Sequence, residues 1–170
     1  MPAAISVEVS DRKVIDYVDA LRAKVTDLRP ALDDVGENVE QKVRLLFTDG
    51  EDPQGRPWKA LKFRQGEPLR DTGQLMNSIT HRASESEVEV GTNLKYAHVH
   101  QFGAEIKPVK AKMLVFTPRG FSHPIFAKKV TIPARPFLPQ GDLPATWRQG
   151  ILLVLQRYLG AAKQGAASAG

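Results

Sequence analysis

Two apolar stripes with helical spacing, in the N-terminal part of the chain, constrain the fold more than any other feature of the sequence. The first stripe lies between Arg12 and about Leu28 and consists of Val14, Val18, Leu21, Val25 and Leu28. The second follows Pro30, between about Ala31 and Phe47, and consists of Leu32, Val35, Val39, Val43 and Leu46. Intervals of three and four place each stripe on one face of a helix. Each apolar face needs a covering surface, which a downstream sheet is expected to supply.

The segments that flank these helices have simpler patterns. Residues 3–9 alternate between apolar and polar side chains, which predicts a short strand. Ser10 or Asp11 can then cap the first helix, because each offers a side-chain oxygen to the free amides of the first turn. Residues 49–57 are rich in glycine, proline and acidic residues and predict a loop. Trp58, Leu61 and Phe63 are expected to anchor this loop to the body.

The middle of the chain predicts two short helices and one hairpin. Asp71 or Thr72 can cap a short helix that continues to about residue 79. Alternating residues at 79–84 and 86–91, with a polar turn between them, predict a hairpin. Residues 96–102 predict a further short helix, which the glycine that follows can end.

The C-terminal third predicts strands first and then a helix. Two β-like runs, at residues 113–117 and 125–132, flank a loop rich in turn-forming residues and together predict a projecting hairpin. Three prolines then enforce an extended path. A last helix is predicted at about 144–159, and the small, polar residues 160–170 predict a flexible tail.

The fold class predicted from these elements is α+β, with a small, mostly antiparallel sheet flanked by helices and a projecting basic hairpin. A chain of 170 residues suits one compact domain. We expect this domain to span residues 1–160 and to consist of three parts. These parts are a helical pair at about 11–48, a core at about 55–140 and the C-terminal helix.

The formal net charge of +5 conceals an uneven distribution. No acidic residue lies between Glu105 and Asp142, whereas the same stretch holds seven cations, namely Lys107, Lys110, Lys112, Arg119, Lys128, Lys129 and Arg135. The remainder of the chain is therefore weakly acidic. A basic stretch at 107–135 indicates an oriented contact with an anionic surface, either nucleic acid or another protein. A solvated basic hairpin without a partner is the alternative.

The sequence offers few candidates for catalysis or for a cofactor. The chain has no cysteine, which excludes disulfides, thiolate zinc sites and cysteine nucleophiles. His98 and His100 would share a face in a strand but not in a helix, and two ligands do not make a metal site. No serine lies in a nucleophile elbow, and no glycine loop of the phosphate-binding kinds is present. We therefore expect no enzyme activity, no metal and no cofactor.

Two further classes of partner can be weighed from the sequence. No apolar run reaches the length of a membrane-spanning helix, and the first residues lack the pattern of a secretory signal, so no membrane contact is expected. Phe116, Phe121 and Phe126 alternate with cations, a composition that could stack bases and neutralise phosphates. No known nucleic-acid-binding signature accompanies them. A DNA-binding module based on residues 107–135 is thus the alternative function.

Four ordered motifs in the centre of the chain carry a resemblance to a known family. They are Leu69-Arg-Asp71-Thr72-Gly73-Gln-Leu-Met-Asn-Ser-Ile79, Val90-Gly-Thr-Asn93, Tyr96-Ala-His-Val-His100-Gln101-Phe102-Gly103 and Ile132-Pro-Ala-Arg135-Pro-Phe-Leu138. The loop with Gly55, Pro57 and Trp58 resembles the family's G-x-x-W segment. In this order they resemble Mu-like virion morphogenesis proteins, which are tail-completion proteins of tailed phages and prophages. The resemblance covers about residues 43–140.

The resemblance implies a structural role in a virus particle. Members of the family look like ring-forming subunits at the head-proximal end of the tail or in the neck, assembled in the host cytoplasm. It implies a homo-hexamer that contacts the tail-tube protein and head–tail connector or neck proteins, with DNA passing through the channel without sequence-specific contact. It leaves open whether the protein is a tail terminator, a neck joiner or an assembly factor, and whether the tail is contractile.

The motif residues can be understood physically in that role, and they are the candidate interface residues: Asp71, Thr72, Gly73, Tyr96, His100, Gln101 and Arg135. The first three predict a helix cap followed by a residue with positive φ. Tyr96, His100 and Phe102 offer the mixed aromatic surface favoured at interfaces, although a place in the core is the more common fate for Phe102 and Phe137. Pro136 holds Arg135 extended, with its guanidinium directed to a carboxylate of a partner or of the same chain.

Overall fold

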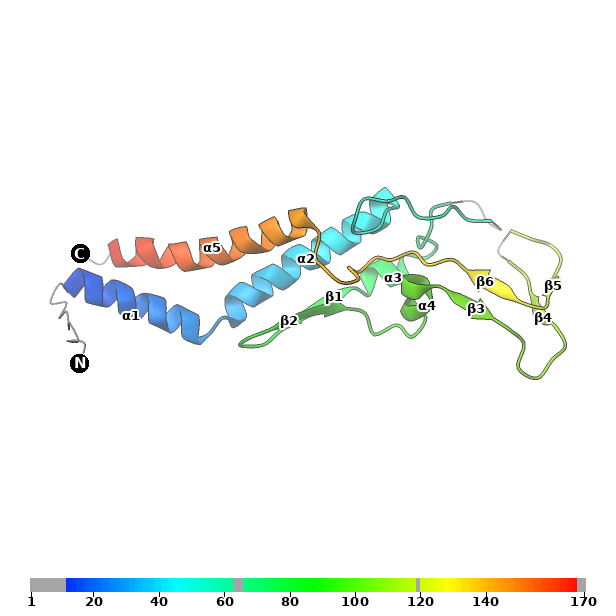
Figure 1. Cartoon of the computed structure of the whole chain (residues 1–170), viewed down its shortest axis with the longest axis horizontal. Coiled ribbons are helices and arrows are strands. Elements are labelled where there is room, and N and C mark those ends of the chain that lie inside the picture. Colours follow the sequence, from blue (N-terminus) through cyan, green and yellow to red (C-terminus); the bar gives the residue numbers. More distant parts are fainter. Residues whose placement is uncertain (1–11, 63–65, 119, 168–170) are drawn as a thin grey trace, which may run out of the picture.

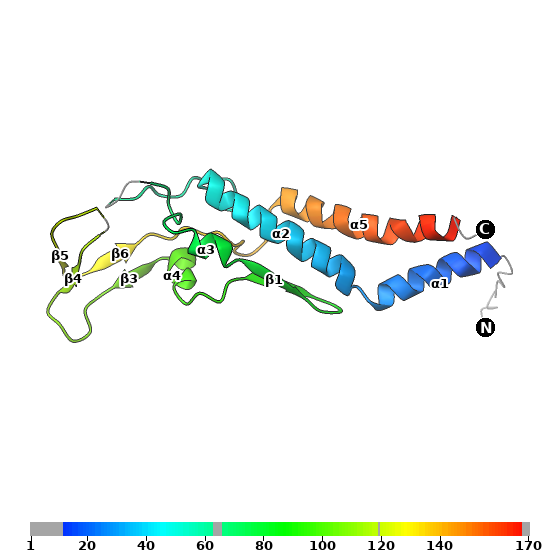
Figure 2. The same ribbon diagram turned by 180° about the vertical axis from the view of Figure 1, so that it is seen from behind.

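The computed structural model describes residues 12–62, 66–118 and 120–167 (Figure 1). The strand predicted at residues 3–9, the caps predicted at Ser10 and Asp11, the anchor predicted at Phe63, and Arg119 of the basic stretch lie outside the described residues. Within them, the molecule is elongated, with a helical arm at one end and a β-hairpin at the other. Figure 2 shows the same arrangement from behind.

The helices lie where the apolar periodicity predicts them, with shifted ends. Their bounds are α1 Arg12–Thr26, α2 Arg29–Asp49, α3 Gln74–Asn77, α4 Ala97–Phe102 and α5 Ala145–Ala167. Pro30 lies in the first turn of α2 and does not separate the two helices, because proline is tolerated where the amide needs no helical partner. Helix α5 extends to Ala167, so residues 160–167, predicted as a flexible tail, are helical.

The strands form antiparallel pairs, which confirms the α+β class. Their bounds are β1 Thr80–Ala83, β2 Val88–Gly91, β3 Ala104–Ile106, β4 Leu114–Phe116, β5 Ile125–Ala127 and β6 Val130–Ile132. They pair as three separate two-stranded ladders, β1–β2, β3–β6 and β4–β5, rather than in the single sheet that the sequence predicted. The run predicted at 125–132 is broken at Lys128 and Lys129, and β3 was missed. Three residues are too few to give an alternation signal.

Helix α2 is the centre of the molecule. The largest fully buried side chains include Phe47 and Val43, which lie on α2. The others are Phe137 and Ile79, which lie outside this helix. The ring centroids of Phe47 and Trp58 lie 5.6 Å apart in an edge-to-face arrangement, and those of Phe47 and Phe137 lie 5.4 Å apart. Trp58 is buried, as predicted, and donates from Nε1 to the carbonyl of Pro136 at 2.8 Å. The core therefore joins α2, the loop after it and the proline-rich segment near residue 137.

The β1–β2 hairpin packs on α2 through His81. Its Nδ1 lies 2.7 Å from Oε2 of Glu40 and its Nε2 lies 3.2 Å from Oδ1 of Asp33, both on α2. Gly36, one turn from each carboxylate, leaves room for the ring, since a Cβ there would lie 2.7 Å from Cγ of His81. The hydrogen bond to Glu40, and then that to Asp33, raise the pKa of His81 against the opposing effect of burial.

Helix α1 does not bury the stripe that its spacing predicts. Val18 and Val25 are 52% and 56% exposed, and Ile15 is exposed as well. Helix α1 packs against α5, away from the sheet that was expected to cover it (Figure 1). The spacing predicted the helix correctly but not the exposure of Val18 and Val25, because spacing does not specify which element lies against a helix.

No helix within the described ranges combines the length and the apolar character that crossing a membrane requires.

Candidate functional site

The fold brings residues of the motifs together around α4. A hollow of about 340 Å³ is lined by all the candidate interface residues except Gln101, namely Asp71, Thr72, Gly73, Tyr96, His100 and Arg135. They come from the loop before α3, from α4 and its N-cap, and from the extended segment after β6. The sequence thus identified residues that meet in space, although they lie more than sixty positions apart at the extremes.

The Asp71-Thr72-Gly73 turn positions α3 differently from the prediction. Gly73, with φ 76°, is itself the N-cap, and no side chain makes the capping hydrogen bond. Thr72 lies one residue further out, where its Oγ1 accepts from the amide of Gln74 at 3.3 Å. The prediction of a positive φ at Gly73 is confirmed, and that of a cap at Asp71 or Thr72 is wrong. A residue in the left-handed region fills the cap position, and glycine adopts it without strain.

Arg135 is a buried residue of the subunit, with only 6% of its surface exposed. Its Nε donates to the carbonyl of Lys59 at 2.8 Å and its Nη2 to that of Ala60 at 3.3 Å. Its backbone amide donates to the carbonyl of His100 at 2.7 Å. Arg135 therefore ties the segment after β6 to α4 and to the loop after Trp58, and it offers little surface to another protein.

The two histidines of α4 point to different neighbours. The His100 ring meets the edge of Tyr96 at 5.9 Å, and its Nδ1 is buried with no hydrogen-bond partner among the described residues. Burial, and then the charge of Arg135, lower the pKa of His100, which favours the neutral ring. The ring of His98 packs on Phe102 at 4.7 Å. No cluster of three potential metal ligands occurs within the described part of the chain.

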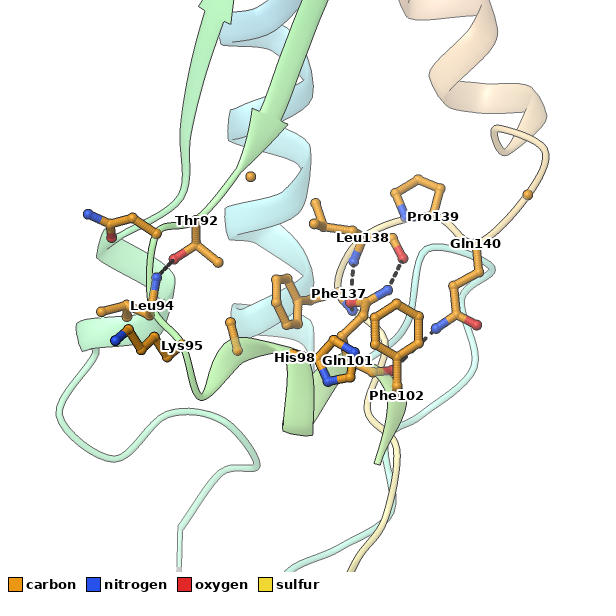
Figure 3. A pocket seen from close by; sticks show the side chains of 14 residues that line it. Thr92, Leu94, Lys95, His98, Gln101, Phe102, Phe137, Leu138, Pro139 and Gln140 are labelled. Carbon is orange, nitrogen blue, oxygen red and sulfur yellow. Dashed lines mark hydrogen bonds between the residues drawn. The ribbon is translucent and has the colours of Figure 1, made fainter. Parts of the chain in front are cut away.

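Gln101 uses its side-chain amide inside the subunit (Figure 3). It is 5% exposed, and its Oε1 accepts from the amides of Phe137 at 3.0 Å and Leu138 at 3.1 Å. Its Nε2 donates to the carbonyl of Leu138 at 2.7 Å. The side chain of Gln101 thus makes the hydrogen bonds that a neighbouring strand would otherwise make with the extended segment at residues 137–138. These bonds explain why a polar residue is buried in an otherwise apolar environment.

A larger groove of about 760 Å³ opens on the other side of α4 (Figure 3). Its walls are residues 91–95, α4 and residues 137–141, so three of the four motifs build it. Phe102 lies at the edge of this groove and is 56% exposed, so the expectation that it belongs to the core is wrong. For Phe137, which is buried, the same expectation is confirmed. Thr92 joins this groove to the first motif, because its Oγ1 lies 2.7 Å from Oγ of Ser78.

The basic stretch is less free than its sequence suggests. Lys107 and Lys129 bind Glu105 at 2.8 and 2.9 Å, and these contacts lower the pKa of Glu105 to about 2. With Arg135 buried, Lys110, Lys112 and Lys128 are the exposed cations that form no ion pair in the described part of the basic stretch. The hairpin of β4 and β5 projects from the body at the end of the molecule, as predicted (Figures 1 and 2).

Asp52 is a structural residue that the sequence analysis did not single out, because residues 49–57 were predicted only as a loop. It is buried, and it accepts hydrogen bonds from the amides of Gln54 and Arg56 and from Nε of Arg56 at 2.7 Å. Burial acts to raise its pKa, but these hydrogen bonds and the charge of Arg56 lower it. The signal was present as an Asp-Pro-x-Gly turn.

Comparison with known proteins gives one consistent result. The profile of the phage virion morphogenesis family matches residues 9–160. The chain is similar to the Mu-like prophage FluMu G protein 2 of Haemophilus influenzae, with 36% identity over 136 residues. That alignment covers 79% of this chain and 83% of the relative. No solved structure matches.

Proposed function

The chain belongs to the phage virion morphogenesis family, and we propose that it is a tail-completion subunit within the virion. In this role it forms a homo-oligomeric ring, with six subunits as the expected number, at the head-proximal end of the tail or in the neck. The ring ends tail growth and joins the tail to the head. Its partners are the tail-tube protein on one side and connector or neck proteins on the other.

The observation that carries this proposal is the use that the motif residues make of their polar groups. Arg135 and Gln101 bind backbone groups of their own chain, and Ser78 binds Thr92. The same motifs leave aromatic surface exposed, at Tyr96 and Phe102, beside a groove of about 760 Å³. Buried polar contacts that fix a rigid aromatic surface are typical of a protein that binds other proteins.

A structural role requires binding surfaces rather than a catalytic centre. The imidazole of His100, which would be the natural base among the motif residues, is half-buried beside Tyr96, and its pKa is lowered, first by burial and then by the charge of Arg135. It faces no serine or cysteine among the described lining residues of its hollow. We therefore propose that the protein acts by assembly and that no reaction depends on it.

The DNA-binding alternative loses support from the geometry of the basic stretch. Two of its lysines are bound to Glu105, and its arginine at position 135 is buried. Three exposed lysines remain among the described residues, enough for passive contact with DNA in a channel and few for tight binding. Binding of the purified protein to duplex DNA with a steep dependence on salt would restore this alternative.

Electron microscopy of particles made by a phage that lacks this gene tests the proposal. Filled heads separate from tails are expected, and expression of the intact chain from a plasmid should restore joined particles. Overlong tails would identify a terminator, whereas headless tails of normal length would identify a joining protein. Intact particles in normal numbers would contradict tail completion in either form.

A further inference from the structure

The β4–β5 hairpin has an apolar face that its own chain does not cover. Val115 and Phe126 are directly opposite each other in the ladder, so their side chains lie on the same face. Each is 60% exposed. The two strands have three residues each and pair only with one another among the described strands. A two-stranded hairpin of this size is marginally stable in water, so a covered face would stabilise it.

The charges around this face restrict what can cover it. Lys112 precedes β4 and Lys128 follows β5, both exposed and outside the ion pairs formed by described residues. A partner surface must therefore combine apolar contact with negative charge. Burial of Phe126 without a carboxylate for Lys128 would leave a lysine partly desolvated and unpaired, which is unfavourable.

A surface of this kind exists on the chain itself, between α2 and α5. A hollow of about 440 Å³ there is lined by Val154 and Tyr158 of α5 and by the carboxylates of Asp34 and Glu37 of α2. Its remaining lining residues are Asn38, Gln41 and Arg157. Asp34 and Glu37 are exposed, and no ion pair joins either one to a cation among the described residues. The hollow thus offers apolar surface beside two carboxylates, and with the guanidinium of Arg157 in its lining it carries a net charge of −1 (two negative charges and one positive).

The hairpin cannot reach this hollow in its own subunit. The hairpin lies at one end of the elongated molecule, whereas α5 and the start of α2 lie toward the other end (Figures 1 and 2). The residues that line the hollow belong to these two helices. The contact can form only between two copies. It joins different surfaces of the two subunits, so it leaves one hairpin and one hollow free and continues into a closed ring or a filament.

The groove beside α4 is the other large hollow, and it fits the hairpin less well. Its lining includes Lys95 and His98 and contains no carboxylate. A lysine-flanked hairpin would gain no charge pairing there, whereas the α2–α5 hollow offers two carboxylates against the single cation Arg157.

We propose that the β4–β5 hairpin of one subunit docks in the α2–α5 hollow of the next copy. Val115 and Phe126 cover Val154 and Tyr158, and Lys128 faces Asp34 and Glu37. The inference rests on the proposed function only in taking the product of this contact as the ring of the tail-completion subunit. Self-association itself is a property that the purified chain reveals.

A charge exchange tests the pairing. Lys128→Glu and Glu37→Lys should each weaken self-association by about 5–10-fold at low salt, because each replaces attraction by repulsion at a partly exposed pair. The double variant should return to within about 3-fold of the original chain. Sedimentation at several concentrations measures the effect, and thermal unfolding checks that each variant folds. Double-variant association as weak as that of the single variants would overturn the pairing.

The absence of cysteine permits a second test with a clean background. Phe126→Cys combined with Gln41→Cys, on the rim of the hollow, should give a ladder of disulfide-linked oligomers on mild oxidation. Phe126→Cys combined with Lys95→Cys, on the other groove, should not. The experiment is made in solution and in purified particles. No ladder in either sample, or a ladder with Lys95→Cys alone, would overturn the inference.

The two proposals can fail separately. If particles require the gene but no cross-link forms, tail completion stands and the hairpin contact is wrong. If particles form without the gene while the cross-linked ladder appears, the contact between copies stands and tail completion is wrong.

Discussion

The centre of the molecule and the β4–β5 hairpin contain the same kinds of residue in opposite environments. Phe47 is fully buried on α2 between Trp58 and Phe137, whereas Phe126 is 60% exposed on β5. The centre is held together within one chain, by aromatic packing and by backbone groups that Gln101 satisfies. The β4–β5 hairpin is held by the ladder between its two strands. The difference places the folding core around α2 and leaves on the hairpin the exposed apolar face that the proposed contact between copies uses.

Helices α1 and α2 also differ in how far their apolar side chains are buried. Both carry an apolar residue every three or four positions. Val43 of α2 is fully buried, and Val25 of α1 is 56% exposed. Helix α2 lies between α5 and the β1–β2 hairpin, while α1 meets α5 alone among its major contacts. The same periodicity therefore gives a buried face in α2 and exposed apolar side chains in α1.

Paired truncation of phenylalanines should give the largest contrast between centre and hairpin. Phe47→Ala should lower the free energy of unfolding by about 3–5 kcal/mol, because it leaves a cavity among Trp58 and Phe137. Phe126→Ala should change that of the monomer by less than about 0.5 kcal/mol, because its ring is already in water. Denaturant unfolding at low protein concentration measures both. Equal losses would show that the hairpin belongs to the folding core and would break the comparison.

Replacement of Gln101 should show that polar contacts also hold the centre. Gln101→Met keeps the size of the side chain but leaves the amides of Phe137 and Leu138 and the carbonyl of Leu138 without their partner. We expect a loss of about 2–4 kcal/mol of stability, since each unsatisfied buried group costs about 1–3 kcal/mol. The exposed Gln156→Met on α5 serves as the control and should be nearly neutral. A neutral Gln101→Met would mean that the segment is held by packing alone.

Two glycines in helices should respond to alanine with opposite signs. In Gly36→Ala the new Cβ would lie 2.7 Å from Cγ of His81 and 2.9 Å from Cγ2 of Val88, so α2 and the β1–β2 hairpin must separate. A loss of about 1–3 kcal/mol is expected. In Gly160→Ala nothing lies within 4 Å, and helix propensity should stabilise α5 by about 0.5–1 kcal/mol. A destabilising Gly160→Ala would reveal packing at this end of the arm.

The smallest effect should come from pH and should be confined to the centre. The pKa of His81 is raised in the folded chain, so His81 stabilises the folded state fully at pH values below its pKa of about 6.5 in the unfolded chain. This stabilisation is lost as the pH rises through the higher pKa that His81 has in the folded state. Stability measured between about pH 5.5 and about pH 8.5 should fall, and His81→Gln should flatten this part of the profile. An unchanged slope in His81→Gln would exclude His81 as its source.

Much of the fold could be predicted because it depends on local patterns. The spacing of Val35, Val43 and Leu46 predicts both α2 and its buried face. The polar turn between β1 and β2, the short helix that contains His100, and the positive φ of Gly73 are also local properties. The motif residues were predicted as one set, and the hollow beside α4 brings them together.

The sequence by itself determined the α+β class, the helices, the antiparallel pairing of short strands and the membership of its motifs in one family. Only the tertiary structure decided what each residue does there. It buried Arg135 and Gln101, paired Lys107 and Lys129 with Glu105, and left Phe102 and Phe126 in water. The physical reason is that periodicity describes one element at a time. Burial and charge pairing depend on which distant segment lies against that element, and long-range packing alone determines this.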